Sequence, residues 1–446
     1  MNHDLSLILF ALGAIIALVL LIARFKMHPF LALTLVALAI GLYSGMKLPE
    51  IAKTFQLGVG NTLGFLSVVV GLGLMLGKLL AESGGAQVVA RNFIRLLGEK
   101  RLPWAMLLVA LIVGVPVLFT VGLVLLVPVI YAIARETKSP LLKIAIPSVA
   151  GLSVAQGLLP PHPGPMLAIE QMHANVGKTI LLGALVGLPT AIVAGPLFGL
   201  LVSRRLQVDP GTVAATAPHS HAQHTPPGFG LTLLTILTPI LLMLQATLAD
   251  LMLPVDNLAR DVSDFVGSPI IAMLLAVLLG TWSFGFARGF SGKQVLKFLE
   301  DSLAPAAGIL LVVGAGGGLS KILDQGGLGK IIAHSVEHAR VSPLLLGWLV
   351  AASIRVAVGS ATVAITMASA IMAPVAAGTP GLSRELLVLA MGSGSLFLSH
   401  VNDSGFWFVK ESFKLTVPQT FKTWTVLETS IGLVGLALVL LLSYFV

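Results

Sequence analysis

The sequence predicts an all-α polytopic membrane protein, an inverted repeat of two five-crossing halves that each contain a re-entrant hairpin and a discontinuous helix. The prediction rests on composition, on apolar segments long enough to cross a bilayer, and on a match between the two halves. Of the 446 residues, 56% are apolar and 10% are charged. Soluble domains carry about 25% charged residues, and a soluble fold with so few would expose large apolar patches. The composition therefore excludes soluble, disordered, fibrous and nucleic-acid-binding proteins.

Apolar segments recur along the whole chain. A membrane-spanning helix needs about 20 such residues. The predicted segments are 5–23, 28–46, 61–80, 104–133, 142–169 and 179–203 in the first half, and 229–248, 269–286, 303–323, 343–375, 385–409 and 425–446 in the second. The stretch 204–228, rich in Pro, Ser, Thr and His, predicts a polar central loop. The chain therefore divides into a first transmembrane repeat at 1–203, this loop, and a second repeat at 229–446.

The basic residues predict the orientation. We interpret 104–133 and 343–375, which Gly and Pro interrupt, as hairpins that do not cross, which leaves five crossings per half. With both termini outside, the loops expected inside carry most of the 27 lysines and arginines, as the positive-inside rule requires. The net charge of +8 then follows from topology and needs no acidic partner. No cleavage site follows 5–23, so we expect a first span rather than a removed signal peptide.

The two halves resemble each other in sequence, which indicates a duplication. The matches, in chain order, are Gly71–Leu80 with Gly314–Leu323, Val117–Thr120 with Val363–Thr366, and Gly151 and Gly164 with Gly392 and Gly405. An odd number of crossings per half makes such repeats inverted, as in many secondary transporters. A parallel repeat with six crossings per half is the alternative.

Paired helix breaks indicate where a ligand binds. Interrupted backbone is tolerated in lipid only where protein or a water-filled cavity satisfies its polar groups, and matching breaks in two repeats mark transporter sites. One pair is Gly114–Gly122 with Arg355–Thr362, and the other is Leu159–Pro165 with Ser399–Gly405.

The second pair of breaks favours a small hydroxylated carboxylate as the ligand. The prolines of Leu159–Pro165 cannot continue a helix, and the N–H groups that start the next half-helix attract an anion. We therefore place the carboxylate near Gly164 and Gly405. The hydroxyls of the ligand are expected to meet polar side chains that otherwise serve as helix caps. These are Ser399, Asn402 and Ser404.

Asp403 is the strongest single signal for ion coupling. An acid inside a span is costly unless it is paired, hydrated or protonated, and such acids form proton relays in transporters. The alternative is a structural Asp that caps the following half-helix. His162 and His400 are further candidate proton carriers because histidine titrates near neutrality. Their alternative role is to donate hydrogen bonds in the wall of the site, where His162 also counts as a substrate contact.

The first pair of breaks adds a cation and two hydroxyls. Arg355 lies deep in the predicted hairpin 343–375, where its guanidinium is suited to grip a carboxylate. It can instead pair with a protein acid or extend to the membrane surface. Ser360 and Thr362 follow Gly359 at the expected hairpin tip, so we predict that they contact the ligand or an ion.

Other charged and metal-ligating residues receive structural interpretations. Lys78 and Lys321 occupy matching positions near span ends, where long basic side chains extend to the interface. Glu82 and Asp324 are expected to face water or these lysines. We interpret the central-loop histidines as part of a solvated loop, and we predict no metal site. These histidines are His219, His221 and His224.

Two motifs resemble a known family. The stretches Gly157–Pro165 and Ser399–Trp407 are similar to those of the gluconate permease family of sugar-acid/proton symporters, and Val358–Thr362 resembles a hairpin tip of the wider ion-transporter superfamily. The resemblance covers nearly the whole chain. It implies a bacterial inner-membrane symporter for gluconate or a related acid such as ketogluconate, glycerate or D-serine. The superfamily implies scaffold and transport domains, homodimers and elevator-like motion.

The sequence thus predicts proton-coupled uptake of D-gluconate, with the sugar acid and the bilayer as partners, termini in the periplasm and no cofactor beyond the coupling ion. Sodium coupling stays open, because unwound carbonyls also hold that ion. An intramembrane enzyme is disfavoured, since the chain has no cysteine, no His-Glu-x-x-His motif and no use for a repeat. The asymmetric polar content of the two repeats and the lone Asp403 argue against a passive channel.

Overall fold

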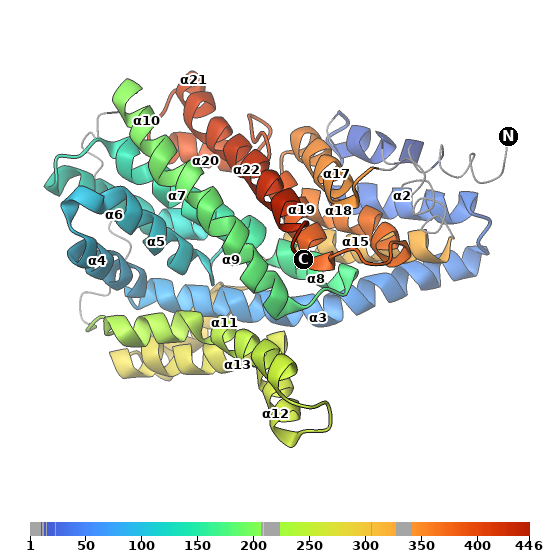
Figure 1. The fold of residues 1–446 in the computed structure, drawn as a ribbon, viewed down its shortest axis with the longest axis horizontal. Coiled ribbons are helices and arrows are strands. Elements are labelled where there is room, and N and C mark those ends of the chain that lie inside the picture. The colour runs from blue at the N-terminus through green and yellow to red at the C-terminus, as the bar shows by residue number, and fades with distance from the viewer. Residues whose placement is uncertain are drawn as a thin grey trace.

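The computed structural model describes residues 24–206, 224–304, 306–326 and 341–446, together with 10, 13, 14, 16–22 and 208. Within these ranges the regular structure is helical throughout, which confirms the predicted all-α class (Figure 1). In the same part of the chain, nine helices are long and apolar enough to cross a membrane. About half of the predicted first span, 5–23, and most of the central loop, including His219 and His221, lie outside the described residues.

Helices cover each predicted apolar segment from 28–46 onward, and further helices lie between those segments. In the first half they are α2 (Pro29–Tyr43), α3 (Leu48–Glu82), α4 (Gly85–Leu97), α5 (Leu102–Gly114), α6 (Phe119–Glu136), α7 (Leu141–Leu158), α8 (Pro163–Met172), α9 (Val176–Ile192) and α10 (Phe198–Arg205). In the second half they are α11 (Phe229–Met252), α12 (Leu258–Gly267), α13 (Pro269–Gly280), α14 (Gly292–Asp301), α15 (Ala306–Gln325), α17 (Pro343–Val358), α18 (Ala361–Gly378), α19 (Arg384–Gly394), α20 (Ser404–Ser412), α21 (Val417–Thr420) and α22 (Val426–Leu442). One-turn π-helical segments join α9 to α10 and α21 to α22, and extend α13; they are η2 (Val193–Leu197), η5 (Phe421–Thr425) and η3 (Thr281–Gly285).

Each of the two predicted hairpins consists of two helices, and the chain turns between them at the predicted Gly and Pro interruptions. Between α5 and α6 the chain passes through Pro116, which has no N–H to donate to a helix. Between α17 and α18 it passes through Gly359, whose φ of 85° is left-handed. A Cβ there would also lie 2.3 Å from the Asn402 carbonyl oxygen, so only glycine fits this turn.

Both predicted discontinuous helices are interrupted. Helix α7 ends at Leu158, two prolines follow, and α8 begins at Pro163, the first-turn position that proline favours. Helix α19 ends at Gly394, and α20 begins after Asp403, whose carboxylate accepts a hydrogen bond from the Gly405 N–H. Each half therefore contains a helix pair and a broken helix in the same order, which agrees with the predicted duplication. The inverted relation of the halves stays a prediction.

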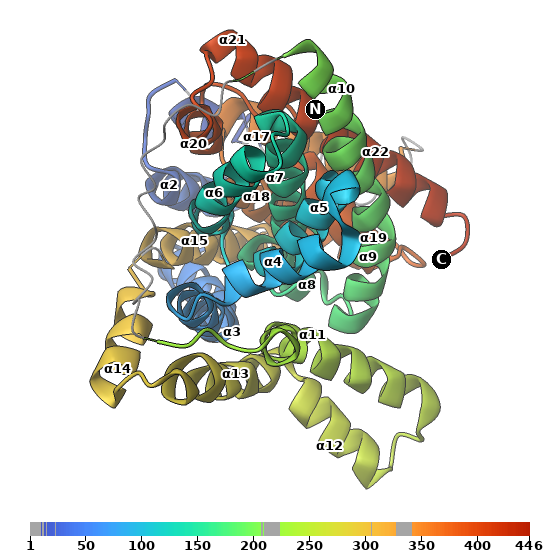
Figure 2. The same ribbon diagram turned by 90° about the vertical axis from the view of Figure 1, so that its left-hand side faces the viewer.

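Helices α3 and α15 pack along each other and separate two groups of elements. On one side α13 and α14 pack on α3, and α11, α12 and α13 lie together at one edge of the molecule (Figures 1 and 2). On the other side α18 packs on both α15 and α8. Helices α9 and α22 pack against α7 and α19 farther from α3. The broken helices and helix pairs thus form one group, and α15 contacts that group through α18.

Candidate functional site

A cavity of about 400 Å³ lies where the four interrupted elements meet. Its volume falls within the about 300–1,000 Å³ of small-molecule sites. One wall is formed by both helix-pair turns, at Leu118–Thr120 and Ser360–Val363. The broken helices contribute the end of α7 and Asp403–Gly405, and α2 and α15 close the opposite side. We call this space the central cavity.

Arg355 and Asp403 form a buried ion pair in the wall of the central cavity. Arg355 Nη2 donates to Asp403 Oδ2 at 2.6 Å, and the two side chains are 2% and 11% exposed. Arg355 Nη1 donates to the Gly359 carbonyl, which ties the pair to the turn between α17 and α18. Of the three roles predicted for Arg355, which are to grip a substrate carboxylate, to pair with a protein acid or to extend to the membrane surface, the structure shows pairing with a protein acid. Arg355 also lines the cavity.

The Asp403 carboxylate is held by three groups at once. Besides Arg355, it accepts hydrogen bonds from the Ser399 hydroxyl and from the Gly405 N–H, the latter at 2.8 Å. The Trp424 indole N–H donates to Ser399 Oγ at 2.7 Å and extends the network to η5. Asp403 is thus the helix cap that the sequence offered as its structural alternative, and it is paired with a cation as well.

The N-termini of α6 and α18 lie at the central cavity, as does that of α20. Helices α6 and α18 both have 18 residues and begin at the central cavity. The first N–H groups of a helix have no partner within it and carry the positive end of the helix dipole. At α6 the Phe119 N–H donates to Gln156 Oε1 at 2.8 Å, and the next residue, Thr120, lines the cavity. At α18 the first residues are Ala361 and Thr362, and the Val363 N–H donates to Ser360 Oγ at 3.4 Å.

Glu428 is a cavity residue that the sequence analysis missed. It lies in α22, is 1% exposed, and accepts a hydrogen bond from the Ser153 hydroxyl of α7. Ser153, Gln156 and Trp424 also line the cavity and were not predicted. The available signal was an acid within the apolar segment 425–446, the same signal that identified Asp403.

Five predicted residues lie outside the central cavity wall. Gly164 lines a small adjoining pocket that shares Gln156 and Thr362 with it. His162 Nε2 lies 2.6 Å from the Gly114 carbonyl oxygen, within the turn after α5. His400 Nε2 and Asn402 Nδ2 both contact the Val356 carbonyl oxygen, at 3.0 and 2.8 Å. The fifth is Ser399, which touches the site through Asp403. The remaining predictions do line the cavity, namely Arg355, Ser360, Thr362, Asp403, Ser404 and Gly405.

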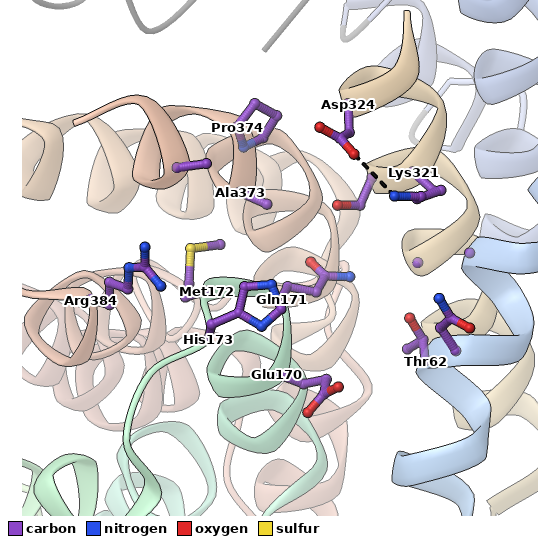
Figure 3. Close-up of a pocket in the computed structure, with 15 residues that line it drawn as sticks. Thr62, Glu170, Gln171, Met172, His173, Lys321, Asp324, Ala373, Pro374 and Arg384 are labelled. Carbon is purple, nitrogen blue, oxygen red and sulfur yellow. Dashed lines mark hydrogen bonds and ion pairs between the residues drawn. The ribbon is translucent and has the colours of Figure 1, made fainter. Parts of the chain in front are cut away.

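A second cavity, of about 280 Å³, lies at the other ends of α15 and α18. Figure 3 shows Thr62 on α3, Lys321 and Asp324 on α15, and Glu170 and Gln171 at the end of α8 around it. Lys321 pairs with Asp324 at 3.1 Å, which is one of the two alternatives predicted for Asp324. Both amide atoms of Gln171 are buried without a hydrogen-bond partner among the described residues, which indicates a hydrated space.

The described residues include no group of three or more His, Asp or Glu side chains placed to hold a metal ion. Of the central-loop histidines, His224 is described, and its Nδ1 lies 2.9 Å from the Arg288 carbonyl oxygen.

The long apolar helices, the two interrupted helices and the polar cavity between them define a multi-pass membrane protein of the transporter class. The family model for GntP family permeases matches residues 5–445, and the chain belongs to this family. The resemblance seen in two motifs is thereby confirmed.

Several relatives are similar in sequence to this chain over nearly their full length. The chain is 51% identical to the gluconate permease of Pseudomonas aeruginosa, covering 99% of both chains. It is 42% identical to the high-affinity gluconate transporter of Escherichia coli, covering 98% of this chain and 99% of that one. It is also 39% identical, with the same coverage, to a protein of Escherichia coli named the Gnt-II system L-idonate transporter.

Solved structures of more distant proteins share the fold. The YdaH transporter of Alcanivorax borkumensis matches with a TM-score of 0.65 at 19% identity, covering 94% of this chain and 98% of that one. MtrF of Neisseria gonorrhoeae matches with a TM-score of 0.64 at 17% identity, covering 88% of this chain and 83% of that one.

Proposed function

We propose that this protein is a secondary active transporter that takes up D-gluconate or a closely related sugar acid together with protons. The observation that carries the proposal is the central cavity, where two helix N-termini, one arginine and several hydroxyl and amide groups converge. The names of the relatives support gluconate as the substrate, and the L-idonate relative supports a related acid as the alternative.

The chemistry of the cavity wall suits a sugar acid. A carboxylate placed between the first N–H groups of α6 and α18 meets two positive helix ends, with the Arg355 guanidinium nearby in the wall. The polyol chain then meets Ser360, Thr362 and Ser404, whose hydroxyls both donate and accept hydrogen bonds. This assignment moves the carboxylate from the α8 and α20 ends to those of α6 and α18, because the Asp403 carboxylate at the start of α20 would repel a second carboxylate there.

The two cavities support an elevator-like alternating access. Helix α15 contributes Gly308 and Val312 to the central cavity and Ser320 and Asp324 to the second. The cavities therefore lie at opposite ends of one span-length helix. In the orientation predicted from the basic residues, the central cavity is on the cytoplasmic side and the second on the periplasmic side. Sliding the interrupted elements along α15 would carry the substrate between them.

The test is uptake of labelled gluconate into proteoliposomes under an imposed proton or sodium gradient, with related acids as competitors. We expect accumulation driven by a proton gradient and abolished by a protonophore. Accumulation driven by a sodium gradient alone would mean that sodium, and not the proton, is the coupling ion. Equilibration of gluconate without accumulation would contradict a secondary active transporter.

The proposal also covers the cellular location and the oligomeric state of the protein. We place the protein in the bacterial inner membrane as a homodimer with periplasmic termini, on the basis of the family resemblance and the basic-residue count. Light scattering of the purified protein in detergent is expected to give twice the chain mass, and a single chain mass would contradict the dimer.

A further inference from the structure

Glu428 is buried in the wall of the central cavity without a cation of its own. It is 1% exposed, and the partner that its carboxyl contacts is the neutral hydroxyl of Ser153. Burying an ionised carboxylate costs several kcal/mol unless a cation and further hydrogen bonds compensate it. The charge of Arg355 also acts on this carboxyl, but Arg355 is already paired with Asp403. One hydroxyl does not supply the remaining compensation, so burial here favours the neutral, protonated form of this side chain.

The other charged groups around the cavity have partners of their own. Its titratable or charged lining residues, besides Glu428, are His28, Arg355 and Asp403. Arg355 directs its two terminal nitrogens to Gly359 and Asp403, while its Nε has no hydrogen-bond partner among the described residues. The Asp403 carboxylate is further held by Ser399 and Gly405. His28 caps α2, where its Nδ1 accepts from the Phe30 N–H at 3.3 Å. Among the described residues, the helices packed on α22 add no other charge to this wall.

We propose that Glu428 is the site that binds the coupling proton. The inference rests on the proposed function and gives the proton to a residue other than Asp403, which is already paired with Arg355. A proton from water bonds to a Glu428 carboxylate oxygen, so the cavity loses a negative charge before the anionic substrate enters. After the substrate leaves, the O–H bond breaks and the proton returns to water. An ionised Glu428 would repel the substrate carboxylate, so proton and substrate binding favour each other.

The test is the substitution Glu428→Gln. The side-chain amide that it introduces is similar to a protonated carboxyl group and cannot ionise. In proteoliposomes we expect this variant to exchange labelled for unlabelled gluconate at a rate near that of the wild type, since substrate binding and movement need a neutral side chain. It should lose accumulation driven by a proton gradient, and its exchange should no longer depend on pH. The matched control is Glu50→Gln, an exposed acid beside Lys47, which should behave as the wild type in both assays.

The outcomes separate this inference from the proposed function. Wild-type protein that neither exchanges nor accumulates gluconate would contradict the function itself. Normal accumulation by Glu428→Gln, or loss of exchange in a folded variant, would overturn the role of Glu428 alone. Ser153→Ala provides a second measurement if Glu428→Gln does not fold. Without the hydroxyl that hydrogen-bonds the carboxylate, uptake should become half-maximal at a higher pH, and an unchanged pH profile would count against the proposal.

Discussion

Arg355 and Asp403 each lower the free-energy cost of burying the charge of the other residue. Replacing Asp403 with Asn leaves the Arg355 charge buried and unpaired, and breaking such a pair costs about 3–5 kcal/mol. We expect Asp403→Asn to lower the thermal unfolding temperature and to lose both gluconate exchange and accumulation. Thermal unfolding in detergent and proteoliposome transport measure the two effects.

The Asp250–Arg260 pair provides the matched control. Its nitrogen–oxygen distance is 2.7 Å, but its side chains are 33% and 21% exposed, and exposed pairs contribute only about 0–1 kcal/mol. Asp250→Asn should therefore be close to wild type. In addition, Arg355→Gln combined with Asp403→Asn should be less destabilised than Asp403→Asn alone, because no buried charge remains. Equal stability of Asp403→Asn and Asp250→Asn would contradict this account of the pair.

Single residues were predictable where a charge interrupts an apolar segment. Asp403 and Arg355 stand out in this way. The sequence analysis offered helix capping as the structural alternative for Asp403, and pairing with a protein acid as one alternative for Arg355. It did not identify the two residues as each other's partners, because the pair joins positions 48 residues apart through the fold. Glu428 carries the same signal, but the sequence analysis named no role for it. Its partner Ser153 is 275 residues away and has no sequence signature.

At the scale of elements, the contact of α15 with α18 depends on a glycine. A Cβ on Gly316 would lie 2.4 Å from Thr366 Cγ2, and overpacking of this kind costs about 1–3 kcal/mol. Since Gly316 lies between the two cavities along α15, we expect Gly316→Ala to slow uptake while gluconate binding stays near wild type. Uptake kinetics and calorimetric binding on the same preparation separate the two effects.

A second substitution tests the contact directly. Thr366→Ser removes the methyl group that the new Cβ would strike, so adding it to Gly316→Ala should restore uptake. Gly60→Ala, on an open face of α3, is the matched glycine control and should leave uptake unchanged. If the double variant transports no better than Gly316→Ala, the close approach is not what limits movement.

The breaks in the helices were predictable because proline and glycine act locally. Pro160, Pro161 and Gly359 mark interruptions that the structure places where they were expected. The amphipathic helices α4, α12 and α14 were not predicted, because their charged faces shorten the apolar segments used to find spans. Helix α3 extends to 35 residues, well beyond the predicted 61–80, since polar residues such as Lys53 are tolerated at its end.

For the whole molecule, the account predicts that the two cavities open to opposite sides of the membrane. The natural sequence has no cysteine, so single-cysteine variants need no prior substitution. A membrane-impermeant thiol reagent should label Ser320→Cys from the periplasmic side and Thr362→Cys from the cytoplasmic side. Labelling in right-side-out and inverted vesicles measures this. Labelling of both variants from the same side alone would contradict alternating access along α15.

The order of the spans and breaks along the chain was predictable from the apolar segments and from the Gly and Pro residues that interrupt them. The place where the breaks come together in the fold was not predictable. The convergence of two turns and two breaks on one cavity depends on how α2, α15 and α22 pack around them. Those packings join residues hundreds of positions apart, as Ser153 and Glu428 show.

The most direct test of the central claim is an experimental structure of the protein with gluconate bound. The account predicts density for the sugar acid in the central cavity, with its carboxylate between the starts of α6 and α18 and its hydroxyls at Ser360 and Thr362. Density confined to the second cavity beside Arg384, or a central cavity left unoccupied at saturating gluconate, would contradict it.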